Sequence, residues 1–286
     1  MNTLEITKNI MRSNGIFAKK IFGQNFLVDD NILEGIVESA KVTNDDKIIE
    51  IGPGLGNLTH YLLQTGAKVI AFEIDNDMID ILNQRFPKQD NLEIINKDIL
   101  KVNLEEFVKD KKVKIIANLP YYITTPIIFK LLEHRSNIES ITIMIQKEVA
   151  ERITAAPHSK DYGVLTINTN YLADVQKVIN VPNTSFIPAP NVTSSVIQIV
   201  PNENKEKSLG IMDEDIFKDL VKKAFSERRK KLSNSLSNTG IKDMTKKEID
   251  NIIESVGLSS NCRAEEVSIE DYVKIANIIA IKCKKS

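Results

Sequence analysis

The fold of this chain is decided by residues 48–63, whose sequence is "IIEIGPGLGNLTHYLL". A short β-branched apolar run, typical of a buried strand, ends at a glycine-rich turn, and a helical pattern begins directly after it. The turn holds Gly52, Gly54 and Gly56, which allow the main chain to bend tightly and a ligand to approach it closely. A strand that enters a helix through such a turn is typical of a parallel α/β sheet, so the stretch predicts both a fold class and a ligand site.

The same alternation of strands and helices continues along the chain. The remaining apolar runs predict strands at 68–75, 92–98, 114–120, 140–153 (which passes into a helix), 164–181 and 194–201. Amphipathic patterns predict helices at 29–42, 58–66, 76–86 and 125–135. This order implies a doubly wound, mainly parallel sheet with helices on its faces.

The character of the sequence changes after residue 201. Residues 202–210 are polar and show no periodicity, which predicts a linker. Helical patterns follow at 213–236, 245–256 and 268–283. We therefore expect a first domain over residues 1–201, with a basic N-terminal arm, and a small all-helical domain over residues 211–286.

Composition excludes several classes of protein. The 286 residues carry a formal net charge of −1, so the chain is not coated with positive charge, although a local basic patch can still contact nucleic acid. No apolar run approaches the roughly 18 residues of a membrane helix, and the N-terminus lacks the features of a signal peptide. Cys262, Cys283 and the scattered histidines do not have the spacing of metal ligands. We expect a cytoplasmic protein that binds no metal.

Two carboxylates follow strands next to the glycine turn. Glu73 ends the predicted strand 68–75 at about the offset expected for an acid that binds ribose hydroxyls. Asp98 ends the next strand, where it can accept a hydrogen bond from an adenine amino group. NAD enzymes share the first of these acids, so the turn alone leaves S-adenosylmethionine and NAD equally open.

The end of the strand at 114–120 separates these two cofactors. It has the sequence Asn118-Leu119-Pro120-Tyr121, which a dehydrogenase does not need. The N6 lone pair of adenine is delocalised into the ring and is a poor nucleophile. The Asn118 side-chain oxygen and a rigid carbonyl at Leu119–Pro120 can hold the amino hydrogens, and Tyr121 offers a stacking face. These residue types favour methylation of an exocyclic amine.

Several motifs in this order resemble the ribosomal RNA adenine N6-dimethyltransferases, most closely the members that act on 16S rRNA. They are "GQNFLVD" (23–29), "EIGPGLGNLT" (50–59), "AFEID" (71–75), "KDIL" (97–100), "NLPYYITTPIIFKLL" (118–132), "IQKEVAERI" (145–153), "SKDYGVLTI" (159–167) and "SFIPAPNVTSSVI" (185–197). The resemblance implies a Rossmann-like class I methyltransferase sheet that uses S-adenosyl-L-methionine. It also implies dimethylation of two adjacent adenosines in a hairpin loop near the 3′ end of 16S rRNA, in the maturing small subunit. We expect the protein to be a monomer.

The resemblance also assigns residues to roles. Asn25 and Leu27 are expected near the methionine end of the donor, and Asn118 is expected to face both the donor and the target amine. The full donor site expected from the motifs is Asn25, Leu27, Gly52, Gly54, Glu73, Ile74, Asp98, Ile99 and Asn118. The catalytic set is Asn118, Leu119, Pro120, Tyr121 and Phe186. Phe186 is expected to hold the flipped base against Tyr121. The loop that carries it also contains Pro188 and Pro190, which equally suit an ordinary loop before an edge strand.

Basic residues are concentrated in the segment 221–236, "VKKAFSERRKKLSNSL". Such a run is usually a solvated helix face, but an enzyme acting on RNA needs phosphate contacts and the rest of the chain is nearly neutral. We expect RNA contacts here and in the N-terminal arm, at Lys19, Lys20, Lys222, Lys223, Arg228, Arg229 and Lys230.

Three other functions remain open at this stage. The first is a 23S rRNA adenine N6-methyltransferase of the macrolide-resistance type, which shares the donor site. The second is a ribosome-assembly factor that keeps the fold without the chemistry. The third is an NAD oxidoreductase, which the Asn-Leu-Pro-Tyr sequence disfavours.

Overall fold

The computed structural model describes residues 1–16, 24–108 and 111–284. The described chain forms two compact units: residues 1–150 with 175–201, and residues 151–174 with 202–286. Residues 151–174 therefore group with the C-terminal helices, whereas the sequence placed them in the first domain.

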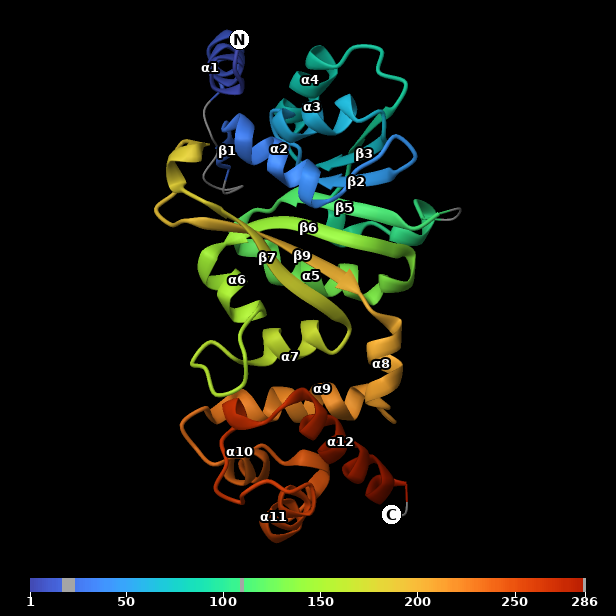
Figure 1. The fold of residues 1–286 in the computed structure, drawn as a ribbon, viewed down its shortest axis with the longest axis vertical. Coiled ribbons are helices and arrows are strands. Elements are labelled where there is room, and N and C mark those ends of the chain that lie inside the picture. The colour runs from blue at the N-terminus through green and yellow to red at the C-terminus, as the bar shows by residue number, and fades with distance from the viewer. Residues whose placement is uncertain (17–23, 109–110, 285–286) are drawn as a thin grey trace. The chain divides into compact units, whose positions relative to one another are not determined.

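The first unit is built on a seven-stranded sheet of described residues (Figure 1). Its strands are β2 (Lys47–Ile51), β3 (Lys68–Glu73), β4 (Leu92–Asn96), β5 (Val113–Asn118), β6 (Ile138–Gln146), β7 (Ala173–Val181) and β9 (Ser194–Pro201). The strand order is β4-β3-β2-β5-β6-β9-β7. The five neighbouring strands β4, β3, β2, β5 and β6 run parallel, and β9 is antiparallel to β6. The predicted doubly wound, mainly parallel sheet is confirmed.

Helices connect the parallel strands and cover the faces of this sheet. Figure 1 shows α2, α3 and α4 on one side of it and α5 on the other. The helices that follow the chain through this region are α2 (Asp30–Ser39), α3 (Asn57–Gln64), α4 (Asn76–Arg85), α5 (Thr124–Glu133) and α6 (Lys147–Ile153). The strand order reverses between β2 and β5, and in open α/β sheets this switch point is where ligands bind.

The core of the first unit explains why the strands are nearly continuous apolar runs. Residues such as Ile49, Ile115 and Ile143 are fully buried because helices cover both faces of a parallel sheet. This packing fixes the carboxyl ends of β2, β3, β4 and β5 side by side at one edge.

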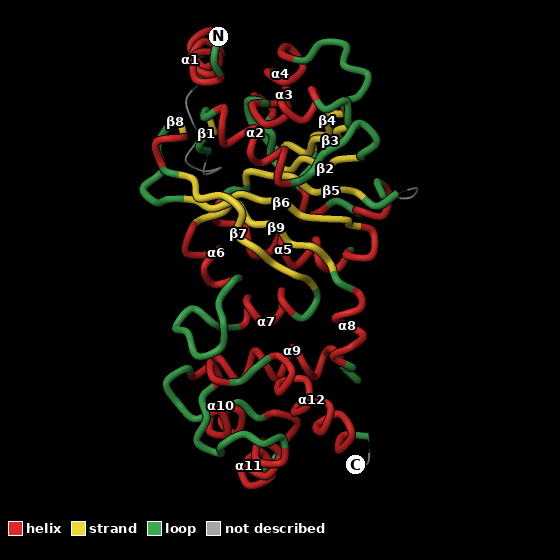
Figure 2. The backbone as a smooth tube through the Cα atoms, in the orientation of Figure 1, coloured by secondary structure: helices red, strands yellow, loops and turns green. Residues whose placement is uncertain are grey.

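Two short elements close one side of that edge. Strand β1 (Phe26–Leu27) and strand β8 (Phe186–Ile187) are labelled in Figure 2. They pair antiparallel, with Leu27 opposite Phe186. The N-terminal residues form helix α1 (Thr3–Ser13), whose Ile10 and Met11 pack against a cluster that contains Phe26. The segment expected to be a basic arm is thus helical in its first part.

The second unit is helical apart from the start of β7. Its helices are α7 (Val164–Asn170), α8 (Glu203–Leu209), α9 (Glu214–Ala224), α10 (Leu232–Asn238), α11 (Lys246–Ser255) and α12 (Ile269–Cys283).

Short 3-10 turns occur in both units. They are η2 (Ile99–Lys101), η3 (Leu104–Glu106), η4 (Tyr121–Ile123), η5 (Arg135–Asn137), η6 (Asn183–Ser185), η7 (Phe225–Glu227), η8 (Ile241–Asp243) and η9 (Ala264–Glu266). Of the helices described, none has the length and apolar character needed to cross a bilayer.

Two predictions of local structure were wrong. Residues 164–170 were expected to begin a strand but form α7, because buried contacts of Thr166, Ile167 and Thr169 override the β propensity of their branched side chains. The Thr166 hydroxyl also donates to the Arg152 carbonyl. Residues 203–209, expected in a linker, form α8, which begins at an Asn202 side-chain cap and ends at the left-handed Gly210.

Candidate active site

A cavity lies at the carboxyl ends of β2, β3, β4 and β5. It holds about 1090 Å³ of space, the open solvent at its mouth included. Every residue that the sequence analysis assigned to donor binding lines it: Asn25, Leu27, Gly52, Gly54, Glu73, Ile74, Asp98, Ile99 and Asn118. Parallel strands bring these residues together because their carboxyl ends meet at one edge of the sheet.

The glycine turn forms the floor of one end of the cavity. Gly52, Gly54 and Gly56 all have positive φ values, of 68°, 57° and 80°, which side chains other than glycine adopt at a cost. A Cβ built on Gly52 would meet no atom within 4 Å, so the main chain there is open to a ligand. A Cβ on Gly56 would lie 2.6 Å from a ring carbon of Phe86, so this glycine is required by packing.

Glu73 is held at the end of β3 by the main chain around it. Its carboxylate accepts hydrogen bonds from the N–H groups of Gly54 (3.1 Å), Ile74 (2.8 Å) and Asp75 (3.0 Å). Burial raises the pKa of Glu73, and these three hydrogen bonds oppose the rise by favouring the charged form. A carboxylate has about four acceptor directions, so one direction remains for a ligand hydroxyl.

Asp98 lies beyond the end of β4 and caps the following turn. Its Oδ1 accepts a hydrogen bond of 2.9 Å from the Leu100 N–H. This bond orients the carboxylate and leaves Oδ2 as the atom for an amino group of a ligand. The exposed Lys97 also lines the cavity here, which the sequence did not indicate.

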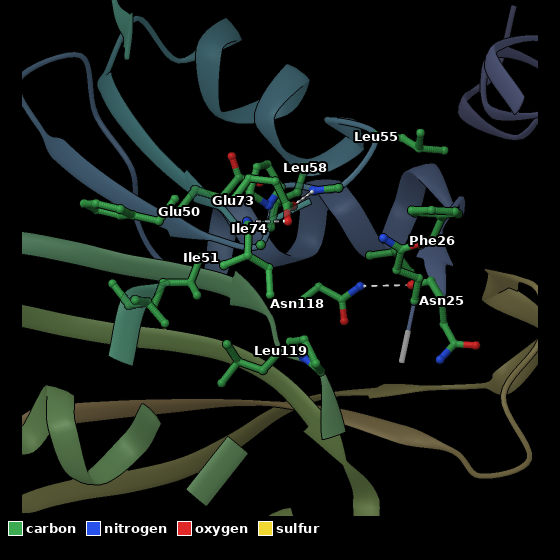
Figure 3. A pocket seen from close by; sticks show the side chains of 18 of the residues that line it. Asn25, Phe26, Glu50, Ile51, Leu55, Leu58, Glu73, Ile74, Asn118 and Leu119 are labelled. Atoms are coloured by element: carbon green, nitrogen blue, oxygen red, sulfur yellow. Dashed lines mark hydrogen bonds between the residues drawn. The ribbon is translucent and has the colours of Figure 1, made fainter. Parts of the chain in front are cut away.

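Asn118 is oriented by the segment that precedes β1. Its Nδ2 donates to the Asn25 carbonyl oxygen over 3.2 Å, and a dashed line marks this bond in Figure 3. One of the two hydrogens of Nδ2 is thus used within the protein, and Oδ1 is the atom that can accept from a ligand. Asn25 thus contributes its main-chain carbonyl to the orientation of Asn118.

The residues after Asn118 form a rigid turn. The Pro120 carbonyl accepts from the Ile123 N–H (3.2 Å) and from the Thr124 hydroxyl (3.2 Å), so the carbonyl of Leu119 is the remaining acceptor at this turn. The Tyr121 hydroxyl shares a hydrogen bond of 2.8 Å with Ser194, and burial raises the pKa of this phenol. Tyr121 therefore presents a fixed neutral ring to the cavity.

Phe186 does not line the cavity. It is 4% exposed and belongs to a buried apolar cluster with Leu27 and Leu33, beneath the β1–β8 pair. The structure thus gives its ring a packing role, and its expected contact with a flipped base stays a prediction.

Glu50 is a cavity residue that the sequence analysis did not single out. It lies within β2, is 1% exposed, and accepts a hydrogen bond of 2.7 Å from the Thr59 hydroxyl. Burial raises the pKa of Glu50 to about 8, with a smaller contribution from the charge of Glu73. In sequence it looks like the outward-facing residue of an ordinary strand, so no signal distinguished it.

The basic residues expected to bind RNA lie in different settings. Lys19 and Lys20 lie outside the described residues. Arg228 donates to the carbonyls of Lys160 and Tyr162 within the second unit, and its guanidinium lies 5.8 Å from the centre of the Phe225 ring. Lys223 and Lys230 form ion pairs with Asp219 and Glu227.

Two of these basic residues differ from the rest of the run. Lys222 and Arg229 are exposed, and the structure records no hydrogen bond or ion pair for either within the described chain.

The strand order, the acids after β3 and β4, and the Asn-Leu-Pro-Tyr turn after β5 define a Rossmann-like methyltransferase. The model of the ribosomal RNA adenine dimethylase family matches residues 16–281, and the chain belongs to this family.

Similar proteins agree with this placement. The chain is 43% identical to "Ribosomal RNA small subunit methyltransferase A" of Lachnoclostridium phytofermentans, over 99% of this chain and 97% of that protein. It is 43% identical to the protein of the same name from Clostridioides difficile, over 96% of each chain. Among solved structures, a dimethyladenosine transferase from Plasmodium falciparum matches with a TM-score of 0.76 and 30% identity, over 89% of this chain and 97% of that chain. The 23S rRNA methyltransferase ErmE matches in fold, with a TM-score of 0.67 and 23% identity over 90% and 100% of the two chains.

Proposed function

We propose that this chain transfers methyl groups from S-adenosyl-L-methionine to the N6 amino groups of two adjacent adenosines near the 3′ end of 16S rRNA, in a hairpin loop of the maturing small subunit. The family and the relatives named as small-subunit methyltransferases favour this substrate over large-subunit RNA. The observation that carries the chemistry is the orientation of Asn118, whose Oδ1 is left as an acceptor inside the cavity.

The cavity residues fit the proposed donor. Gly52 leaves open space beside the main chain, as the close approach of a charged ligand requires. The remaining acceptor direction of Glu73 suits a ribose hydroxyl, and Oδ2 of Asp98 suits the adenine amino group. Ile74 and Ile99 provide apolar contact between these polar ends. When bound, S-adenosylmethionine supplies an electrophilic methyl group, and the other contributions come from the residues of this chain.

The turn after β5 makes the target amine reactive by position. Oδ1 of Asn118 and the Leu119 carbonyl accept the two N6 hydrogens, which favours a pyramidal nitrogen with its lone pair directed at the methyl group. Tyr121 stacks on the adenine ring, an interaction worth about 1–3 kcal/mol per base. This is preorganised hydrogen bonding rather than base catalysis. As the new N–C bond forms, the nitrogen becomes cationic and strongly acidic, so it releases one proton to water, and the reaction needs no strongly basic side chain and no metal ion.

The second compact unit is proposed to contact the RNA backbone, with Lys222 and Arg229 as its main phosphate contacts. All residues that line the cavity come from the first unit of one chain, so a monomer is sufficient for the reaction. We place this activity in the cytoplasm, where small subunits mature.

The substrate assignment is tested by incubating the purified protein with labelled S-adenosylmethionine and either undermethylated small subunits or large-subunit RNA. We expect label as N6,N6-dimethyladenosine from the small subunits only. Label in the large-subunit RNA would support the 23S rRNA alternative. Donor binding without label in either RNA would favour a ribosome-assembly factor.

A further inference from the structure

Asn57 follows the three glycines directly and is the first residue of α3. A dinucleotide fingerprint has its third glycine at this position. The Asn57 side chain is 5% exposed and makes three hydrogen bonds. Its Nδ2 donates to the Leu27 carbonyl (2.8 Å) and to the Thr7 hydroxyl (2.9 Å), and its Oδ1 accepts from Arg85 Nη1 (2.8 Å). One amide thus ties α1, β1 and α4 to the start of α3.

Several residues in this hydrogen-bond network line the proposed donor cavity. Leu27, Leu55 and Asn57 all line it, and Arg85 also donates to the Leu55 carbonyl over 2.5 Å. Thr7 is fully buried in α1 and does not line the cavity. Among the described residues, the hydrogen bond that its hydroxyl makes toward the site is the one from Asn57.

The Thr7 hydroxyl completes the hydrogen bonding of a buried amide. Nδ2 of Asn57 has two hydrogens, and Thr7 and Leu27 accept one each. Without the hydroxyl, one buried N–H has no acceptor, which is costly enough to make the amide and its neighbours rearrange. Because a binding site tolerates displacements of only about 0.5 Å, such a rearrangement weakens ligand binding.

We propose that Thr7 is a positioning residue for the donor cavity, through which helix α1 holds Asn57, Leu27 and the glycine turn in the geometry that binds the methyl donor. This inference rests on the proposed function, because it assumes the donor assigned above. It makes the N-terminal helix part of the donor site rather than only an arm for RNA.

Helix α1 offers a matched control. Thr3 is also buried on α1, but its hydroxyl shares a hydrogen bond of 3.4 Å with Tyr61 and its N–H donates to Asp30 over 3.2 Å. Thr3→Val and Thr7→Val each remove one threonine hydroxyl from α1, but only Thr7→Val removes a hydrogen bond to Asn57.

The test measures the dissociation constant of S-adenosylhomocysteine by calorimetry, with steady-state kinetics on undermethylated small subunits. We expect Thr7→Val to weaken donor binding about tenfold, as for the loss of one buried hydrogen bond. The KM for donor should rise, while kcat and the KM for RNA should change less than about twofold. Thr7→Ser should restore donor binding, and Thr3→Val should leave it within about twofold of wild type. Thr7→Val should have no further effect in an Asn57→Ala background.

Equal effects of Thr3→Val and Thr7→Val on donor binding would overturn the inference, because α1 would then act through general stability alone. Wild-type affinity in Thr7→Val would overturn it as well, with the proposed function intact. Wild-type protein that binds no S-adenosylhomocysteine would overturn the proposed function and this inference together.

Discussion

The buried carboxyl of Glu50 makes the stability of this protein depend on pH in a direction opposite to that of most acids. Its pKa in the folded chain is about 8, against an ordinary value of 4.5. Between these values the folded state keeps a proton that the unfolded state releases, so rising pH favours unfolding. The contribution of Glu50 to the free energy of unfolding is therefore greatest below about pH 4.5. It falls as the pH rises and is lost at about pH 8.

The separation of the two pKa values sets the size of this effect. Each pH unit between them costs about 1.4 kcal/mol, so moving from about pH 5.5 to about pH 7.5 costs on the order of 2–3 kcal/mol. Glu50→Gln removes the ionisable group and keeps both the volume and an acceptor for the Thr59 hydroxyl. The variant should therefore be the more stable protein at neutral pH, with its advantage growing over this range.

The assay is urea unfolding of both proteins without donor, followed by circular dichroism because the chain has no tryptophan. The difference between the two proteins in free energy of unfolding, measured at several pH values, cancels the groups that they share. A difference that does not change with pH would refute the reasoning. It would mean that Glu50 is ionised in the folded chain and stabilised by the nearby charge of Arg85.

Three further results are expected. Glu73→Ala should weaken S-adenosylhomocysteine binding about 10–100-fold in calorimetry by removing a charged acceptor, and an unchanged affinity would contradict the ribose assignment. Gly52→Ala should lower the free energy of unfolding by only about 1–2 kcal/mol, because of its left-handed backbone, yet abolish donor binding. Gly56→Ala should lower it by about 1–3 kcal/mol more, because its Cβ overpacks against Phe86 and Leu82 at the end of α4. Similar unfolding profiles for the two variants would contradict this distinction. The double variant Lys222→Ala/Arg229→Ala should bind rRNA with a weaker dependence on salt. The negative slope of log affinity against log salt should become less steep by about 1.4, and an unchanged slope would exclude these residues as phosphate contacts.

The sequence predicted the parts of the site that lie at strand ends. Glu73, Asp98 and Asn118 each follow a buried strand, and parallel strands bring their carboxyl ends to one edge, so position in the sequence was enough to group them. Asn25 and Leu27 came from the resemblance alone, and the structure supplies their physical reason in the β1 pairing and the bond to Asn118.

Other features depend on contacts that no local pattern reveals. Glu50 and Asn57 interact with groups distant in sequence, such as Arg85. Helix α7 contradicts the strand propensity of its own residues because tertiary packing decides its conformation. The cap of Asn202 and the terminal Gly210 were helix signals present in the sequence, but the polar composition between them suggested a linker.

The most direct test of this account is the yield of N6,N6-dimethyladenosine from small subunits treated with Asn118→Ala, measured beside donor affinity. Asn91→Ala is the control, because its amide donates to the Ala67 carbonyl at the opposite edge of the same sheet. We expect Asn118→Ala to lower the rate of methyl transfer about 10²–10³-fold, as when one preorganised hydrogen-bonding group is lost. Donor affinity should fall much less, and the control should match wild type. Methyl transfer at the wild-type rate in Asn118→Ala would contradict the central role given to this amide.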